Sequence, residues 1–303
     1  MTEQEWLARQ FEDQRPHLRA VAYRMLGSLS EADDAVQESW LRLSSADTSD
    51  VQNLGGWLTT VVGRVCLNML RSRTTRREEP LGPHVPDPVV SPEEGTGPEQ
   101  EALLADSVGL ALLVVLDSLT PAERLAFVLH DMFELPFDEI APMVGRTPTT
   151  ARQLASRARR RVKDAEIPSP EPDLARQRRV VDAFFAAARA GDFDALVHLL
   201  DPDVVVRSDL GPGRRQTVLR GANAVAKLAR PRPGGELRPV LVNGSIGVVA
   251  TRDGQPHTVL AFTIVDDKIV EILGIRDPDR VRHLAAAALT EEQSGQSERT
   301  LHL

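Results

Sequence analysis

Arginines gather in two segments of this chain, and guanidinium groups are well suited to binding phosphate. Five arginines and no acid lie between Gly63 and Arg77, and six arginines, one lysine and no acid lie between Arg146 and Lys163. The intervening residues 79–106 hold seven acids, six prolines and no lysine or arginine. The net charge of −8 therefore does not argue against nucleic-acid binding, because charge is distributed so unevenly along the chain.

The second basic segment has the periodicity of a helix with one apolar face and one polar face. The apolar face is expected to comprise Ala151, Leu154, Ala158 and Val162. The side chains expected on the outer face are Thr149, Thr150, Arg152, Gln153 and Arg157, followed by Arg159, Arg160 and Arg161 toward phosphates. A solvated basic helix end is an equally good interpretation of this helix alone. The turn that precedes the helix favours DNA binding.

The first basic segment predicts a second polar helix face, formed by Arg64, Asn68 and Arg71 with Arg73 beyond it. Such a face could follow a phosphate backbone and hold an unstacked base. The alternative is again a solvated surface. A separate acidic group contains Asp34, Gln37 and Glu38, and for this helix considered alone first-turn acids that complement the helix dipole are the better explanation.

Helical periodicity predicts the elements that position these residues. Residues 3–72 are expected to form helices. One helix is expected to start at a capping box of Ser30 and Asp33, and a further helix at about Gly56. The first of these should bury a stripe of apolar side chains: Ala32, Val36, Trp40 and Leu43. Thr120–Glu123 predicts the start of another helix. A helix-turn-helix is predicted after it, from a short helix at Phe137–Val144, a turn at Gly145 and a second helix that starts at Thr147. Residues 78–100 read as an acidic, proline-rich linker.

The last third of the chain predicts an α+β domain. Helices are expected at Leu174–Arg189 and Phe193–Leu200, followed by a curved sheet. The strands are expected at Val204–Arg207, Leu237–Val242, Ile246–Thr251, His257–Val265 and Lys268–Ile275. The expected domains are residues 1–77, 101–165 and 174–290, joined by linkers at 78–100 and 166–173 and followed by a tail at 291–303.

Several classes of protein are excluded or disfavoured by composition. The single cysteine, Cys66, excludes an internal disulfide framework, and the N-terminal residues lack the layout of a secretory signal, which together favour the cytoplasm. The longest apolar stretch, Val108–Leu116, is well short of the ~20 residues that cross a bilayer, so no membrane partner is expected.

Several motifs, taken in order, resemble the extracytoplasmic-function (ECF) sigma factors of bacterial RNA polymerase. Tyr23–Gly27 and Asp33–Arg42 resemble region 2, Gly56–Asn68 is similar to the promoter-melting helix, and Leu119–Arg124 with the helix-turn-helix is similar to region 4. The resemblance implies that Asp34, Gln37 and Glu38 dock on the polymerase clamp. It also implies that residues 57–77 open the minus-ten element and that residues 147–161 read the minus-thirty-five element.

The C-terminal third resembles the SnoaL-like (NTF2-like) domain that one ECF subgroup carries. Gly82–Pro88, Asp209–Arg214 and Asp277–Val281 resemble three motifs of that subgroup, with His84, Pro212 and Asp277 departing from them. The resemblance implies that this domain modulates sigma activity through interdomain contacts. The residues it implicates are His84, Pro86, Asp87, Pro88, Asp209, Asp277, Pro278 and Asp279.

The sequence therefore predicts a multidomain sigma factor, two all-α domains followed by an α+β SnoaL-like domain, with core RNA polymerase and promoter DNA as partners. The alternative is a one-component transcriptional regulator whose C-terminal domain binds a small ligand, and the sequence leaves open whether that domain holds one. No catalytic residue, metal or cofactor is predicted. Asp209, His198 and His257 are the candidates for an acid–base site, but a turn aspartate and surface histidines explain them better.

Overall fold

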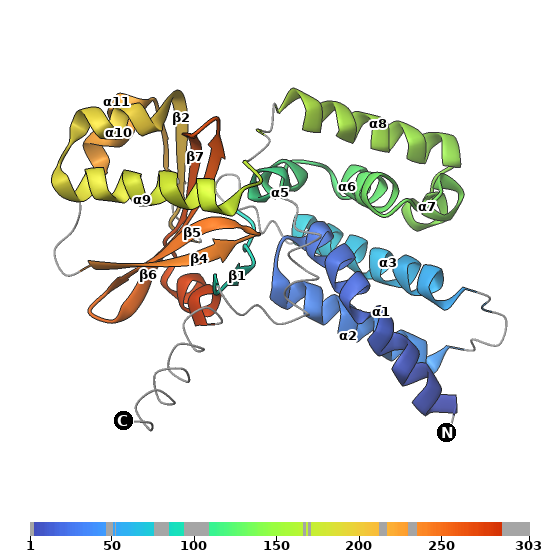
Figure 1. Ribbon diagram of the computed structural model, residues 1–303. Helices are drawn as coiled ribbons and strands as arrows, with labels where there is room; N and C mark the ends of the chain where they lie inside the picture. The colour runs from blue at the N-terminus through green and yellow to red at the C-terminus, as the bar shows by residue number, and fades with distance from the viewer. Residues whose placement is uncertain are drawn as a thin grey trace, which may run out of the picture. The chain divides into compact units, whose positions relative to one another are not determined.

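The computed structural model describes residues 3–46, 51, 53–75, 85–93, 109–165, 168, 171–211, 217–229 and 235–286. The chain divides into two compact units: the first holds residues 1–79 and 110–167, and the second holds residues 80–109 and 168–303. The first unit is helical and the second is α+β, so the predicted fold class is confirmed (Figure 1). The chain enters each unit twice, because residues 80–109 belong to the second unit. We call residues 76–109 the connector.

The first unit begins with three helices: α1 (Glu3–Leu26), α2 (Leu29–Ser45) and α3 (Leu54–Thr75). The predicted capping box at Ser30 is wrong, because the N-cap of α2 is Ser28, two residues earlier. Gly27, at a φ of 73°, closes α1 by donating its N–H to the Tyr23 carbonyl at 2.8 Å. The turn is therefore complete before Ser30 is reached.

The predicted stripe of α2 is buried at Ala32, Val36 and Leu43, while Trp40 is half-buried. The Trp40 ring packs against Phe11 of α1, with centroids 5.1 Å apart. These apolar contacts orient α2 and leave its other face toward solvent.

The described residues of the first unit form five further helical elements: α5 (Leu110–Asp117), α6 (Pro121–Phe127), the π-helix η1 (Val128–Met132), α7 (Phe137–Val144) and α8 (Pro148–Asp164). The capping box at Thr120 is confirmed, since its Oγ1 accepts from the Glu123 N–H and the Glu123 Oε2 accepts from the Thr120 N–H at 3.2 Å. The predicted start of α8 is confirmed too, because the Thr147 Oγ1 accepts from the Thr150 N–H at 3.3 Å.

Helices α7 and α8 form the predicted helix-turn-helix, with Gly145 in the left-handed region at φ 66° between them. The buried stripe of α8 is Ala151, Ala155 and Ala158, whereas Leu154 and Val162 are only half-buried. The apolar face is thus rotated from the predicted one toward three alanines, whose small side chains allow α8 to pack closely on its neighbours.

The helix-turn-helix region packs onto α3 within the first unit. At Gly63 of α3 an added Cβ would lie 3.2 Å from the Leu129 Cδ1 and 3.5 Å from the Met143 Sδ. The Arg124 side chain of α6 is 2 % exposed, donates from Nε to the Arg24 carbonyl of α1 at 3.1 Å and pairs with Asp117 at 3.2 Å. The interface therefore combines close apolar contact with a buried charge.

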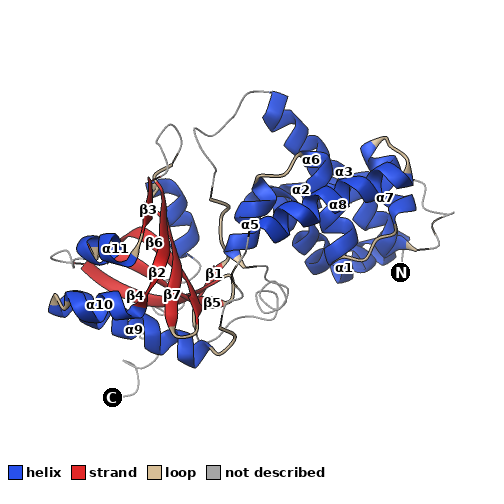
Figure 2. Ribbon diagram, turned by 90° about the horizontal axis from the view of Figure 1, so that it is seen from above, coloured by secondary structure: helices blue, strands red, loops and turns tan. Residues whose placement is uncertain are grey.

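The second unit is built on a β-sheet, drawn in red in Figure 2. Its seven strands lie in the order β1-β4-β5-β6-β7-β2-β3. Its strands are β1 (Val90–Ser91), β2 (Leu200–Asp209), β3 (Thr217–Arg220), β4 (Gly235–Val242), β5 (Ser245–Arg252), β6 (Gln255–Val265) and β7 (Lys268–Ile275). β2 and β7 run parallel, and the other neighbours run antiparallel. The five predicted strands are present, while β1 and β3 are additional.

Helices α9 (Leu174–Ala190), α10 (Phe193–Leu199) and α11 (Ala222–Leu228) cover one face of this sheet (Figure 1). Phe184 and Val225 from the helices share a core with Phe262 and Ile272 of the sheet. Strand residues at alternate positions, such as Val249, are buried on the other face. Buried side chains of the connector residues 85–91 and of helical residues 278–286 lie there: Val85, Val89, Val281 and Leu284.

Candidate nucleic-acid interface and connector-binding site

The exposed face of α8 carries the side chains predicted to contact DNA. Thr149, Arg152, Gln153, Arg157 and Arg160 are exposed and Thr150 is half-buried. Among the described residues Arg157 and Arg160 form no ion pair, whereas Arg152 lies over the Phe137 ring, 5.2 Å from its centroid.

Two neighbouring arginines of α8 are held by acids of the same unit. The Arg159 Nε lies 2.6 Å from the Asp131 Oδ1, and the Arg161 Nη1 lies 3.0 Å from the buried Glu123 carboxylate. Of the three consecutive arginines, Arg160 is therefore the one that does not pair with either acid and is available to bind a phosphate.

The second predicted face lies on α3, where Arg64, Asn68 and Arg71 are exposed at positions that share one side of a helix. Arg73 differs from them, because it is half-buried and pairs with Glu31 of α2. Its guanidinium is thus occupied within the first unit in this structure.

The acidic face of α2 presents Asp34 and Gln37 as exposed side chains. Glu38 is half-buried and pairs with Arg42 one turn along, at 3.1 Å. Leu41 belongs to the same surface and is 55 % exposed. An exposed leucine among acidic and amide side chains is a composition suited to a protein partner.

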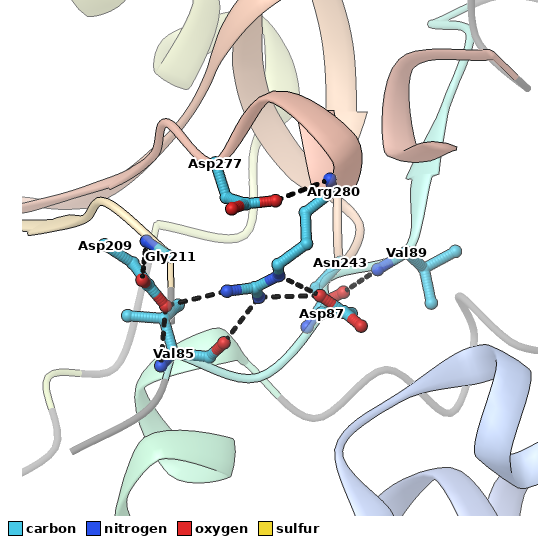
Figure 3. A network of polar contacts seen from close by, with 8 residues as sticks. All are labelled: Val85, Asp87, Val89, Asp209, Gly211, Asn243, Asp277 and Arg280. Carbon is cyan, nitrogen blue, oxygen red and sulfur yellow. Dashed lines mark hydrogen bonds and ion pairs between the residues drawn. The ribbon is translucent and has the colours of Figure 1, made fainter. Parts of the chain in front are cut away.

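The connector is fixed to the second unit by Arg280 of the helix at residues 278–286 (Figure 3). The Arg280 Nε donates to the Asp87 Oδ1 at 2.7 Å, its Nη1 to the Asp209 Oδ2 at 2.7 Å, and its Nη2 to the Val85 carbonyl at 2.6 Å. The Arg280 side chain is 15 % exposed and that of Asp209 is 11 % exposed. One guanidinium thus joins two carboxylates and a connector carbonyl in a largely buried site.

Asp209 is itself held by the backbone around it. Its Oδ1 accepts from the Gly211 N–H at 2.9 Å, and its Oδ2 also accepts from the Val85 N–H at 3.3 Å. Gly211 has a φ of 92°, and a Cβ there would collide with the Asp277 carboxylate, so glycine is required on both counts. Asp277 caps the start of the helix at residues 278–286, since its Oδ1 accepts from the Arg280 N–H at 2.9 Å.

A second anchor lies at the turn between β4 and β5. The Asn243 Oδ1 accepts from the Val89 N–H at 2.7 Å, and the Val89 carbonyl accepts from the Asn243 N–H at 2.9 Å. β1 continues this contact by pairing Val90 with Val242. Asn243 and Gly244 both have positive φ, which is typical of the tight hairpin turn that presents the asparagine here.

The remaining predicted regulatory residues lie in different environments. Pro86 and Pro88 belong to the buried connector segment, and Pro278 follows Asp277 at the start of the helix at residues 278–286. Asp279 is 86 % exposed and pairs with Arg282, away from the connector. His84 lies outside the described residues.

Arg280 and Asn243 were missed as site residues by sequence reasoning. Arg280 lies inside the motif Asp277–Val281, which resembles a motif of the ECF subgroup. It is the one basic residue of that motif that could pair with two distant carboxylates. Nothing local marks Asn243 as more than a turn residue.

The three candidates for acid–base chemistry are not brought together. Asp209 belongs to the Arg280 network, and His198 lies on α10 with its Nδ1 against the Asp194 carbonyl at 2.7 Å. His257 lines a cavity of the second unit, where its Nδ1 lies 2.6 Å from the Thr258 Oγ1.

Comparison with known proteins decides the family. Residues 11–76 match Sigma-70 region 2, and residues 109–162 match Sigma-70, region 4. The ECF RNA polymerase sigma factor SigJ of Mycobacterium tuberculosis is 39 % identical over 289 residues, which cover 89 % of this chain and 92 % of that protein. The chain belongs to the ECF sigma factor family.

Other relatives agree with this assignment. This ECF sigma factor is 38 % identical over 279 residues to the probable ECF sigma factor SigI of the same species, covering 90 % of this chain and 93 % of SigI. The crystal structure of SigJ superposes with a TM-score of 0.69 at 35 % identity, over 90 % of this chain and 97 % of that one. The similarity therefore includes the C-terminal α+β domain.

The sigma factor directs core RNA polymerase to promoter DNA and initiates transcription, through region 2 (α1–α3) and region 4 (α5–α8). The alternative of a one-component regulator is not supported, because such a protein has no use for region 2. Within the described ranges, no helix combines the length and the apolar character needed to span a bilayer.

Proposed function

We propose that the three exposed faces of the first unit divide the work of initiation. Asp34, Gln37 and Glu38 of α2 bind the polymerase clamp, and Arg64, Asn68 and Arg71 of α3 hold the opened minus-ten strand. Arg73 joins that face only after its pair with Glu31 opens. In region 4 the residues that contact the minus-thirty-five element are Thr149, Thr150, Arg152, Gln153, Arg157 and Arg160.

We propose further that the C-terminal domain modulates this sigma factor by holding the connector. The observation that carries this proposal is the bonding of Arg280 to Asp87, Asp209 and the Val85 carbonyl. Regions 2 and 4 must meet two promoter elements on one duplex. A connector fixed at residues 85–91 restricts the separations that regions 2 and 4 can reach. Once one region has bound its promoter element, this separation sets the effective concentration at which the other region meets its own element.

The C-terminal domain acts in this proposal without catalysis. Asp209 is engaged by Arg280, and His198 and His257 lie away from it, so no described pair of these candidates forms an acid–base couple. The place of action is the cytoplasm, where core polymerase works. The domain boundaries follow as region 2 to residue 77, region 4 from 101 to 165 and the regulatory domain from 174 to 290.

Run-off transcription with core polymerase and a cognate promoter tests this function. Truncation after Pro172 removes the anchor of the connector, so transcription should change strongly while the DNA affinity of isolated region 4 stays nearly the same. Asp277→Asn should also change transcription, because Asp277 caps the helix that carries Arg280.

Asp279→Asn is the matched control, since Asp279 lies two residues away on the same helix but faces solvent. The full chain should give promoter-dependent transcripts, and their absence would contradict initiation itself. If Asp277→Asn, Asp279→Asn and the truncated chain all gave the same level of transcription, regulation through the connector would be contradicted.

A further inference from the structure

A cavity of about 710 Å³ lies in the second unit between α9, α11 and the face of the sheet that these helices cover. Phe184, Phe185, Val206, Leu260 and Ile272 line it, so most of its wall is aromatic or aliphatic. The volume falls within the range of roughly 300–1,000 Å³ that is typical of small-molecule sites. The connector is held elsewhere, by Arg280 and by the β4–β5 turn.

Large apolar side chains are exposed where this cavity opens. Leu228 of α11 is 72 % exposed and Leu237 of β4 is 37 % exposed, and both line the cavity. Exposing leucines to water is unfavourable, in proportion to the apolar surface exposed. A bound apolar molecule would cover this surface together with the aromatic wall.

The charged residues of the cavity favour an anion. Arg189, Arg252 and Arg276 line it, against one carboxylate, Glu236. In the part of the chain that the structure describes, neither Arg189 nor Arg252 forms an ion pair. Guanidinium groups bind carboxylates and other oxyanions with charge-assisted hydrogen bonds, which are strongest where water is partly excluded.

We propose that this cavity binds an apolar small molecule that carries a single anionic group. The apolar part occupies the space between Phe184, Phe185 and Ile272, and the anion lies toward Arg189 and Arg252. This binding site does not depend on the proposed role of the connector.

The cavity also shares strand ends with the connector anchor. Ser208 of β2 and Gly274 of β7 are register partners and both line the cavity. Asp209 follows Ser208 directly, and its carbonyl accepts from the Arg276 N–H at 2.8 Å. A ligand packed against Ser208 and Gly274 therefore acts one residue away from the carboxylate that binds Arg280. This coupling rests on the proposed regulation through the connector.

The binding site is tested on the full chain with 1-anilinonaphthalene-8-sulfonate, an apolar aromatic sulfonate whose fluorescence rises in apolar sites. Arg189→Gln combined with Arg252→Gln should raise its Kd on the order of tenfold, the loss of about one charge-assisted hydrogen bond. Arg179→Gln combined with Arg220→Gln is the control, because these two exposed arginines do not line the cavity.

Ala250→Trp is a second variant, since Ala250 lines the cavity from β5 and an indole there would take up part of its volume. It should reduce the fluorescence rise, and near-unchanged unfolding by urea would show that the domain still folds. Equal Kd values for the two arginine pairs, or unchanged binding by Ala250→Trp, would overturn the site.

Hydrogen exchange of the peptide that contains residues 85–91 tests the coupling. Saturation with the sulfonate should change its exchange rate severalfold, and Arg280→Gln supplies the rate of a released connector. Binding without any change in this peptide would overturn the coupling. Failure of the proposed regulation can be distinguished from failure of the coupling. If the regulation is wrong, Arg280→Gln leaves transcription unchanged, whether or not the sulfonate binds.

Discussion

At the scale of single residues, Arg280 joins two segments of the connector site that are far apart in sequence. It satisfies the carboxylates of Asp87 and Asp209 and the carbonyl of Val85, none of which lies near it in the chain. A planar guanidinium can make these bonds at once, and a lysine could not reproduce their geometry. Arg280 is therefore the main side-chain anchor at the Val85–Asp87 end of the connector, as Asn243 is at Val89.

Arg280→Gln should lower the free energy of unfolding of the second unit by about 2–4 kcal/mol, because it leaves the mostly buried carboxylate of Asp209 without its cation. Urea unfolding followed by far-UV circular dichroism measures this loss. All three tryptophans, Trp6, Trp40 and Trp57, lie in the first unit, so the transition followed by tryptophan fluorescence should not move.

Arg282→Gln is the control for this substitution. Arg282 lies on the same helix and pairs with the exposed Asp279, so its loss should cost no more than about 0.5 kcal/mol. A loss of the same size for both variants would show that the helix, and not the Arg280 network, is being destabilised.

At the scale of elements, α8 separates base reading from phosphate binding along its length. Its N-terminal part exposes Arg152 and Gln153, while farther along Asp131 and Glu123 hold the arginines on either side of Arg160. Side chains at the start of such a helix reach base edges, and those farther along meet the backbone. The two groups should respond differently to sequence and to salt.

Arg160→Gln should weaken binding to all sequences alike and reduce the slope of log affinity against log salt by about one unit. Arg152→Gln should instead reduce discrimination between promoter sequences by about 1–3 kcal/mol. Fluorescence anisotropy with labelled duplexes over a salt series measures both, with Arg220→Gln of β3 as the charge-matched control. A sequence-selective loss at Arg160 would contradict the division of α8.

Helix α2 is the second element with a distinct prediction. Replacing Asp34 and Glu38 by lysine should weaken binding to core polymerase, since both lie off the buried stripe beside the exposed Leu41. Pull-down of core polymerase measures the loss. Asp13→Lys combined with Asp182→Lys makes the same change in net charge on exposed positions of α1 and α9. If the Asp34 and Glu38 variant bound core polymerase as well as this control does, α2 would not be the contact.

At the scale of the whole molecule, regions 2 and 4 pack together in one unit although residues 80–109 of the connector between them belong to the other. Their interface at Gly63, Leu129 and Arg124 is close-packed, yet both regions must reach separate promoter elements. We expect this interface to open when the sigma factor binds polymerase.

Cys66 of α3 reports on that opening. Burial raises the pKa of its thiol to about 12, and the Arg124 charge of region 4 acts in the opposite direction. At pH 8 only about one thiol in ten thousand would be the reactive thiolate. If α6 leaves α3, solvent returns the pKa toward its ordinary value, so the thiolate fraction and the access of reagents both rise.

Labelling of Cys66 by iodoacetamide, measured by mass spectrometry, should be slow in the free sigma factor and at least about tenfold faster in the complex with core polymerase. Labelling of the urea-unfolded chain gives the upper limit, and Cys66→Ser gives the background. Equal rates for free and polymerase-bound protein would show that α3 and α6 stay packed.

Features that depend on neighbours within a few residues could be predicted from the amino-acid sequence. The capping residues Thr120 and Thr147 and the turn at Gly145 were predictable, because a cap bonds to backbone only three positions away and glycine alone tolerates the left-handed turn easily. The exposed faces of α3 and α8 followed from helical periodicity. The errors were local too: Ser30 was not the cap because Gly27 had already closed the preceding helix.

The tertiary structure decided which charged residues remain available and what the connector does. Arg159 and Arg73 look as available for DNA as Arg160 and Arg71 in the sequence, but Asp131 and Glu31 hold them. Arg280 meets Asp87 across 193 positions of sequence, and β1 exists only because β4 offers it an edge. Such contacts have no local signature, since they depend on the free energy of burying and pairing groups that meet only after the whole domain has folded.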